Sequence, residues 1–512
     1  MNVQSAANRY PARMASTRNG PPNVTAPIRS GSTPVVIVWF RRDLRLDDNP
    51  ALQAAARSGA RILPVYIHAP DEERPWAPGG ASRWWLHHSL TALDDSLQRY
   101  GGRLIVSTGD SLTTLLGLTE QTGAREIHWN RLYEPAAIER DSLVKRTLRD
   151  RGIAAHSHNA ALLFEPWSVS TRDGRPYRVF TPFWKSCLQL GLPQDAGPPP
   201  ASLTLASAES AALESLELLP RIPWDKGFRE HWQPGEAGAR NMLDTFLDTA
   251  AASYADGRDH PGTRSTSRVS PHLHFGELSP RRIVSMVQEC LAIAGREGLV
   301  SGLEGFMREL GWREFSHHLL YHFPHTPQHS LDERFAHFPW DSGAREAVDA
   351  WRRGRTGIPL VDAGMRELWH TGWMHNRVRM VTASFLTKNL LIPWQEGAQW
   401  FWDTLLDADL ANNTQGWQWT AGCGADAAPY FRVFNPVLQS RKFDPEGRYL
   451  RRWLPELGAL PDRDLHAPWE APPHTLQRAG LRLGQDYPQP IVDLAASRSR
   501  ALSAYATIKQ AE

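Results

Sequence analysis

The sequence predicts a protein of two domains: an N-terminal α/β domain built on a doubly wound parallel sheet, and a C-terminal all-α domain. Short apolar runs alternate with helical segments from Val35 to about residue 151, which is the pattern of such a sheet. A connector at residues 166–235, with the Pro-rich run Gly197–Pro200, then interrupts the chain. Beyond it the strand signal largely disappears and helical periodicity dominates, so we place the helical domain at residues 236–495.

Residues 1–33 predict a disordered extension. They are rich in Ser, Thr, Asn, Pro and Ala, and carry several Arg but no acidic residue, so they cannot bury a core. An Arg-rich, acid-poor start is also found in transit peptides. Pro21-Pro22 and the lack of an amphipathic repeat argue against targeting, and we favour a plain extension.

The α/β domain is predicted over residues 34–165. Asn49-Pro50 is typical of a helix start, with an N-cap followed by Pro at the first helical position. Ligands of doubly wound sheets lie at the carboxyl ends of the strands. The chain has neither GxGxxG nor a P-loop, so an ordinary dinucleotide site is not supported. We expect strands at Val35–Phe40, Ile62–Ile67, Leu104–Ser107 and Ile127–Trp129, and helices near 82–100, 111–122 and 135–151.

Composition excludes several classes of protein. The 512 residues are 41% hydrophobic and 22% charged, which is ordinary for a globular protein. No apolar run approaches the roughly 18 residues of a membrane span, so we expect no membrane association. We also expect the protein to be cytoplasmic and monomeric. The three cysteines lack CxxC spacing and no HExxH is present, which argues against disulfides, an iron–sulfur cluster and a bound metal.

Two stretches of the helical domain combine groups that bind phosphates or bases. The loop Gly262–Pro271 is rich in hydroxyls and has two guanidinium groups, which suits a diphosphate, although a capped turn with solvated Arg is the alternative. Glu309, Trp312 and Arg313 fall within about one helical turn. An acid, an indole and a cation can bind a base and its phosphate, while an amphipathic helix with a core Trp explains them equally well.

A third stretch, Trp373–Trp419, mixes six indoles with Arg, Asp and Asn side chains. Read as a helix, it places Asn376, Arg379 and Met380 on one face, which we expect to line a pocket. Further along the chain, Asp407, Asp409 and Asn413 lie near Trp417, and their carboxylates could act as acid and base or bind a metal. A buried ion pair between Arg379 and an aspartate is the structural alternative.

The most basic stretch is Pro429–Arg452. It has six Arg and Lys residues against Asp444 and Glu446, with aromatic residues interleaved, and is the best local case for a nucleic-acid surface. Charge runs are more often simply solvated faces, so composition alone leaves both interpretations open.

Together these motifs resemble the photolyase/cryptochrome family, most closely its class I photolyases for cyclobutane pyrimidine dimers. The resemblance covers roughly residues 35–505, and several long motifs follow one another in the family's order. These motifs are VVIVWFRRDLRLDDNPAL, TPFWKSC, STSRVSPHLHFGELSP, ELGWREF, GRTGIPLVDAGMRELWHTGWMHNRVRM, NNTQGWQWTAGCGADAAPYFRVFNP and DYPQPIVD.

The resemblance implies a helical domain that binds FAD. Light-excited reduced FAD would donate an electron to a dimer flipped out of DNA. By motif match, the cofactor contacts are Tyr254, Thr266, Ser267, Ser270, Arg379, Asp407, Asp409 and Asn413, with Asn413 facing N5 of the flavin. The dimer would be bound by Glu309, Trp312, Asn376, Met380 and Trp419, and the DNA phosphates by Arg258, Arg313, Arg377 and Arg432. The same match makes Glu309, Asn376 and Met380 catalytic positions.

The resemblance also implies an electron relay and a second chromophore. Trp417, Trp394 and Trp340 match the family's chain of indoles that carries electrons to oxidised flavin, with Trp340 matched more loosely. After Tyr133-Glu134 the chain has Pro135-Ala136-Ala137, where folate-binding relatives tend to carry Asn and Glu. The antenna is therefore either deazaflavin or folate.

Other members of the family fit less well. A (6-4) photolyase would have histidines where this chain has Asn376 and Met380. Cryptochromes of the DASH type tend to lose the substrate-side tryptophans, which are present here. A cryptochrome-type blue-light receptor remains the alternative to a repair enzyme that binds dimer-containing DNA.

Overall fold

The computed structural model describes residues 33–293, 297–427 and 431–509. The predicted disordered extension lies outside these ranges, except for Thr33. Contacts within the chain separate Met1–Thr33 from Pro34–Glu512, and the fold is that of the second unit.

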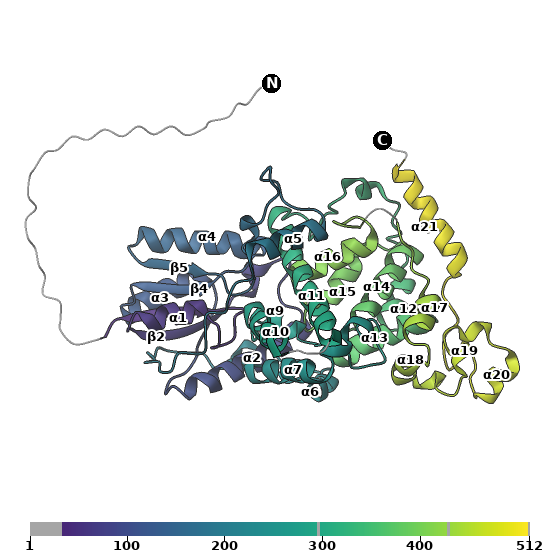
Figure 1. Cartoon of the computed structure of the whole chain (residues 1–512), viewed down its shortest axis with the longest axis horizontal. Coiled ribbons are helices and arrows are strands. Elements are labelled where there is room, and N and C mark those ends of the chain that lie inside the picture. Colours follow the sequence, from purple (N-terminus) through teal and green to yellow (C-terminus); the bar gives the residue numbers. More distant parts are fainter. Residues whose placement is uncertain (1–32, 294–296, 428–430, 510–512) are drawn as a thin grey trace, which may run out of the picture. The chain divides into compact units, whose positions relative to one another are not determined.

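Five parallel strands form one sheet in the order β3-β2-β1-β4-β5, as predicted for a doubly wound domain (Figure 1). In its register, Val36 pairs with Ile62 on one side and with Glu126 on the other. Because the strand order reverses between β1 and β4, the sheet has a switch point there. The strands are β1 (Val35–Phe40), β2 (Arg61–His68), β3 (Ile105–Thr108), β4 (Glu126–Asn130) and β5 (Ala154–His158).

Helices cover both faces of this sheet, which explains why β1 is apolar throughout. Val36 and Val38 pack against α1 and α2, whereas Ile37 and Trp39 pack against α3 and α4. The side chain of Asn49 accepts from the amide of Leu52 and caps α1, as the Asn-Pro signal predicted. The helices of this domain are α1 (Pro50–Arg57), α2 (Gly80–Gln98), α3 (Ser111–Thr122) and α4 (Pro135–Asp150), with a 3-10 turn η1 (Pro70–Glu73).

The four predicted strands are all present, but β5 was not predicted. Its sequence, Ala-Ala-His-Ser-His, has neither a β-branched nor a large apolar residue. β5 pairs only with β4 and lies at the edge of the sheet, where one neighbour and partial exposure relax the demand for apolar side chains.

The rest of the unit is helical, as predicted. The predicted connector contains α5 and α6, and α11, with 26 residues, contacts α5, α8 and α16 (Figure 1). The helices are α5 (Phe180–Leu190), α6 (Lys226–His231), α7 (Glu236–Thr249), α8 (Tyr254–Gly257), α9 (Ser270–His274), α10 (Pro280–Ile293), α11 (Glu297–His322), α12 (Arg345–Arg352), α13 (Pro359–Thr371), α14 (Asn376–Ser384), α15 (Trp394–Thr404), α16 (Leu410–Ala421), α17 (Pro436–Phe443), α18 (Arg448–Trp453), α19 (Asp462–Leu465), α20 (Pro473–Arg478) and α21 (Leu494–Lys509). The shorter turns are η2 (Pro166–Ser168), η3 (Leu213–Leu216), η4 (Ala251–Ser253), η5 (Glu333–His337), η7 (Pro455–Leu457), η8 (Pro468–Glu470) and the π-helix η6 (Phe385–Asn389).

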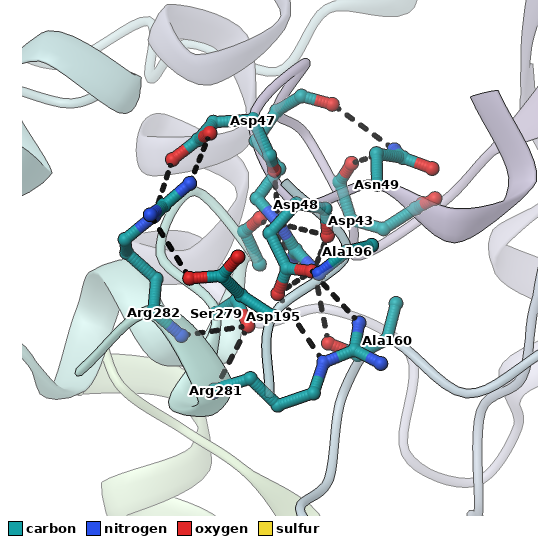
Figure 2. A network of polar contacts seen from close by, with 12 residues as sticks. Asp43, Asp47, Asp48, Asn49, Ala160, Asp195, Ala196, Ser279, Arg281 and Arg282 are labelled. Carbon is teal, nitrogen blue, oxygen red and sulfur yellow. Dashed lines mark hydrogen bonds and ion pairs between the residues drawn. The ribbon is translucent and has the colours of Figure 1, made fainter. Parts of the chain in front are cut away.

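A network of buried charges joins the loop after β1 to the start of α10 (Figure 2). Arg282 binds Asp47 through two nitrogens, at 2.7 and 2.9 Å, and also reaches Asp195 at 2.9 Å. Arg281 lies 3.2 Å from Asp48, a fully buried carboxylate that also accepts from the amide of Ala196. Since the partners come from the sheet domain, the connector and the helical domain, the network fixes these three parts together.

Candidate functional site

The first feature of the site is an ion pair between α14 and the segment before α16. Nη2 of Arg379 lies 3.0 and 2.8 Å from the two carboxylate oxygens of Asp407, while its Nε donates to the carbonyl of Met374 at 2.7 Å. The ion pair that the sequence left as an alternative is thus present. With two of its nitrogens engaged, the guanidinium is held in one orientation.

Asp409 and Asn413 lie at the start of α16. Asp409 caps the helix by accepting from the amide of Asn412 at 2.8 Å, and its other oxygen lies 3.3 Å from Nε2 of His317 on α11. Burial alone would raise the pKa of Asp409, but the His317 charge holds it well below its usual value. Asp409 in turn raises the pKa of His317 against the effect of burial. The two form an ion pair, and the amide of Asn413 donates to the carbonyl of Ala398 at 3.0 Å.

The hydroxyl-rich loop offers unsatisfied donors. Among the described residues, the hydroxyls of Thr266 and Ser267 have no hydrogen-bond partner, whereas Ser270 accepts from the indole of Trp373 at 3.3 Å. Arg268 has a left-handed backbone (φ 54°), and its guanidinium lies 4.6 Å from the rings of both Trp232 and Trp373. Its buried Nε also lacks a partner. Unmatched donors beside a cation suit a phosphate-bearing ligand.

The predicted lesion-binding residues come mainly from α11 and α14. Glu309 is paired at 2.5 Å with Arg258, which follows α8, and the neighbouring Asp259 is paired at 2.8 Å with Arg377. On α14, Asn376 is exposed and Met380 lies one helical turn further on. The loop at Arg258 and Asp259 thereby links both helices.

The other predicted lesion-binding and phosphate-binding residues differ from one another in exposure and in their contacts. Trp312 stacks on Phe180 of α5, with ring centroids 3.8 Å apart, and the indole of Trp419 donates to the carbonyl of Asp426. Arg432 is exposed. The guanidinium of Arg313 is only 12% exposed and donates to the carbonyl of Ala161 at 2.7 Å, so in this structure it connects α11 to the chain after β5.

The three tryptophans predicted to form an electron relay lie in or against one hydrophobic cluster. Trp417 is 2% exposed and Trp394 is 1% exposed, whereas Trp340 is only partly buried and packs against the edge of the cluster. The nearest rings to Trp417 are Phe401 and Trp351, at centroid distances of 5.0 and 6.1 Å. Two of the predicted relay tryptophans are therefore buried, and the third is partly exposed.

A separate pocket opens at the carboxyl edge of β1 and β2. It encloses about 680 Å³, including its open mouth. Trp39 and Tyr66 supply aromatic surface, and Arg41 and Arg140 lie 4.3 and 5.2 Å from the ring of Trp39. Phe275 and Trp402 close it from the helical domain. An aromatic pocket with several cations suits a planar, anionic ligand.

Comparison with known proteins identifies the family. Residues 36–201 match the family model for DNA photolyase, and residues 306–507 match the model for the FAD binding domain of DNA photolyase. The chain belongs to the photolyase/cryptochrome family. It is 47% identical to a deoxyribodipyrimidine photo-lyase of Agrobacterium fabrum over 93% of this chain and 99% of that protein. It is also 42% identical to cryptochrome-2 of Arabidopsis thaliana, over 93% of this chain and 79% of that protein.

A solved structure described as a bacterial class III photolyase from Agrobacterium tumefaciens superposes with a TM-score of 0.89. The two are 46% identical over 95% of this chain and all of that one. The comparisons therefore establish the photolyase/cryptochrome family but not the predicted class I. Within the described ranges, every helix is too short or too polar to cross a bilayer.

A photolyase FAD site fits the residues that the structure brings together. The unmatched donors of the loop after α8 suit a diphosphate, and the fixed Arg379 with the side-chain oxygen of Asn413 can meet a flavin ring. These two groups lie on α14 and α16, which contact each other.

Sequence reasoning missed several residues of this photolyase site. Arg268 was noted only as one guanidinium of a loop, because Trp232, which stacks on it, lies in the connector. Trp351, which is fully buried beside Trp417, was not predicted to be part of the site. Asp259 pairs with Arg377, a predicted phosphate contact. Its position directly after Arg258 was the feature of the sequence that could have indicated it.

Proposed function

We propose that this protein is a deoxyribodipyrimidine photo-lyase, which uses light to split cyclobutane pyrimidine dimers in DNA. The observation that carries the proposal is that α16 contacts both α11 and α14, and that these three helices carry the predicted dimer-side and flavin-side residues. The 47% identity to a deoxyribodipyrimidine photo-lyase over nearly its whole length supports it.

The charges on the proposed flavin side are paired with one another. Asp407 neutralises Arg379 and His317 neutralises Asp409, so neither carboxylate is free to act as a general base. FAD, when bound in its reduced form, supplies the electron after it absorbs light. The protein groups orient it: Arg379 presents a fixed cation, and Asn413 presents an amide on the same side of α16 as the capping Asp409.

On the DNA side, we infer an exchange of partners. Arg258 and Arg377 are 28% and 19% exposed and are held by Glu309 and Asp259. A DNA phosphate competes for each guanidinium, because it offers several charged oxygens. Release of Arg258 frees Glu309 to accept hydrogen bonds from a flipped pyrimidine. Arg377 lies 4.4 Å above the ring of Phe443, which keeps it oriented during the exchange.

We assign the pocket at the carboxyl edge of β1 and β2 to the antenna chromophore. Its aromatic walls and its cations suit either the anionic tail of a folate or a deazaflavin. The lining residues do not discriminate between these two chromophores. Among photolyase classes, the 46% identity to the Agrobacterium tumefaciens structure favours class III over class I. The spectrum of the chromophores released from purified protein identifies both ligands.

The decisive experiment measures light-dependent repair. Protein with chemically reduced flavin is mixed with dimer-containing DNA, and dimers are counted after illumination and after a dark incubation. We expect loss only in the light. If no dimers are lost although the spectrum shows bound, reduced flavin, the repair function is refuted and a cryptochrome-type receptor is favoured.

A matched pair of variants tests the DNA-side exchange. Glu309→Ala leaves Arg258 unpaired and removes the acceptor, so we expect repair at limiting DNA to fall about tenfold or more. Glu304→Ala alters an exposed glutamate on the same helix and should repair like the wild type. Equal repair by both variants would rule out a role for Glu309 at the dimer.

A further inference from the structure

A cluster of three imidazoles and one carboxylate lies on the edge strands of the sheet, away from the residues assigned to flavin and DNA. Glu126 and His128 belong to β4, and His156 and His158 to β5. His128 pairs directly with His156 in the parallel register. Since side chains alternate between faces along a strand, all four project from the same face of the sheet.

The nitrogen and oxygen atoms of this cluster converge. Oε1 of Glu126 lies 2.8 Å from Nε2 of His128 and 3.4 Å from Nε2 of His156. These three residues each offer one ligand atom within 4.8 Å of the others. The rings of His128 and His156 are stacked with centroids 4.8 Å apart, and the Nε2 atoms of both approach Oε1 of Glu126.

These distances are close to those of a tetrahedral zinc site. Zinc binds nitrogen and oxygen at about 2.0–2.2 Å, which puts neighbouring ligand atoms about 3.3 Å apart. The contact between Glu126 and His156 already has this spacing. The contact between Glu126 and His128 is shorter, as expected for a hydrogen bond, and a cation in place of the shared proton requires a shift of only about 0.5 Å.

We propose that Glu126, His128 and His156 bind a divalent transition-metal cation, of which Zn²⁺ fits best. Two imidazoles and a carboxylate are a donor set that zinc takes, with water at the fourth position. The mixed burial suits this arrangement: His128 is buried and fixed by the sheet, while His156 is 48% exposed and leaves a path for the ion.

His158 completes the site from behind. Its Nε2 lies 3.0 Å from Nδ1 of His128, the nitrogen opposite the proposed ligand atom. Metal-binding histidines use such a contact to fix their ring and tautomer: a cation on Nε2 of His128 leaves the proton on Nδ1, which then donates to His158.

The metal joins two strands that meet only at the sheet edge. β5 has one neighbouring strand and few apolar side chains, so its attachment rests largely on the β4 ladder. A cation bound by Glu126 and His128 on one strand and His156 on the other adds a link that does not depend on apolar burial. Spacing along the chain could not show this site, because its ligands come from two strands joined through α4.

A second group, Glu230, His231 and His370, has similar residue types and serves as the control. Its residues lie on α6 and α13, Glu230 and His370 are exposed, and Nδ1 of His231 is bonded to the carbonyl of Gly227. None of its members hydrogen-bonds to another member, unlike the strand cluster, where two such contacts exist already.

The test is Zn²⁺ binding by the full chain, purified without a histidine tag and treated with chelator. We expect one tightly bound Zn²⁺, and a Co²⁺ absorption spectrum typical of tetrahedral coordination. His156→Ala and Glu126→Gln change partly exposed side chains and should weaken binding by at least about tenfold, whereas His370→Ala should leave it unchanged. Light-dependent repair should be the same in all three variants.

Two results would overturn the proposal. One is the absence of tight Zn²⁺ binding by the wild type. The other is Zn²⁺ binding that survives both His156→Ala and Glu126→Gln but is lost in His370→Ala, which would assign the ion to the control group. Thermal unfolding with and without Zn²⁺ provides a second measurement, because an ion bound only by the folded chain raises the melting temperature. Wild-type protein should show this rise and His156→Ala should not.

Discussion

Lys388 provides the sharpest test of the energetics of the helical domain. It lies on the π-helix η6, is 1% exposed, and donates to the carbonyl of Arg432 at 3.0 Å. Its Nζ also lies 3.5 Å from the ring of Phe431. Burial lowers the pKa of Lys388 from 10.5 to about 7. The nearby thiol of Cys423 gives no charge to offset this, because burial raises its own pKa to about 12.

The size of the effect follows from this shift in pKa. At about 1.36 kcal/mol per pH unit, a fall from 10.5 to about 7 corresponds to a cost of roughly 5 kcal/mol for burying the charged amine. Between these two values the unfolded chain holds the proton and the folded chain does not, so stability rises with pH. Below about pH 7 both states are protonated and the full cost remains.

We therefore expect Lys388→Met to stabilise the protein near neutral pH. The variant removes the cost of burying the charge but loses one hydrogen bond, worth about 1 kcal/mol, and leaves the carbonyl of Arg432 unpaired. The net gain in unfolding free energy should be about 2 kcal/mol at about pH 6, and should vanish by about pH 9 as the wild type gains stability.

The assay is urea unfolding of the flavin-bound protein at several pH values, followed by tryptophan fluorescence. Lys442→Met is the matched control, because Lys442 also lies over an aromatic ring, at 5.0 Å from Phe443, but is exposed. Its substitution should change stability by less than about 0.5 kcal/mol at every pH. A wild-type stability that does not rise above pH 7, with Lys388→Met less stable throughout, would refute the reasoning.

Three further predictions concern the candidate site and the ion pairs that support it. Asp48→Ala leaves Arg281 buried without its partner and should cost about 3–5 kcal/mol, measured by thermal unfolding. Trp417→Phe should slow photoreduction of oxidised flavin by about tenfold or more, measured by absorbance, while repair by chemically reduced protein persists. The Asp409–His317 pair contributes stability only above the lowered pKa of Asp409 and below the raised pKa of His317. Asp409→Asn should therefore destabilise most between about pH 4 and 6.5, measured by urea unfolding, and a pH-independent loss would contradict the ion pair.

The strands differ in how far the sequence predicts them, and the difference is physical. β1 reads as a continuous apolar run because both of its faces are covered, and its predicted bounds agree with the structure. β5 carries polar residues at an edge and has no local pattern of its own. Only the need for another strand after α4, a consequence of the alternating architecture, could have indicated it.

For the site too, the sequence predicts which residues lie together on one helix, but not which residues of distant segments contact each other. The turn that joins Asn376 to Met380 follows from spacing along one helix. The partner of Asp409 does not, because His317 lies on α11, nearly a hundred residues earlier. The sequence offered Arg379 as a partner for either aspartate, and only packing of α14 against the segment before α16 selects Asp407.

The two domains are also electrostatically continuous, which gives the network of Figure 2 a functional consequence. His274 lines the proposed antenna pocket and lies 3.9 Å from Asp409 on the flavin side. Arg42, in the same pocket, has its pKa raised by Glu134 and, among others, by Asp409, in opposition to burial. In the proposed function, the domain contact that Asp48 and Arg281 hold also sets the position of the antenna relative to the flavin. Weakening that contact should lower light harvesting before it lowers repair under direct excitation of the flavin.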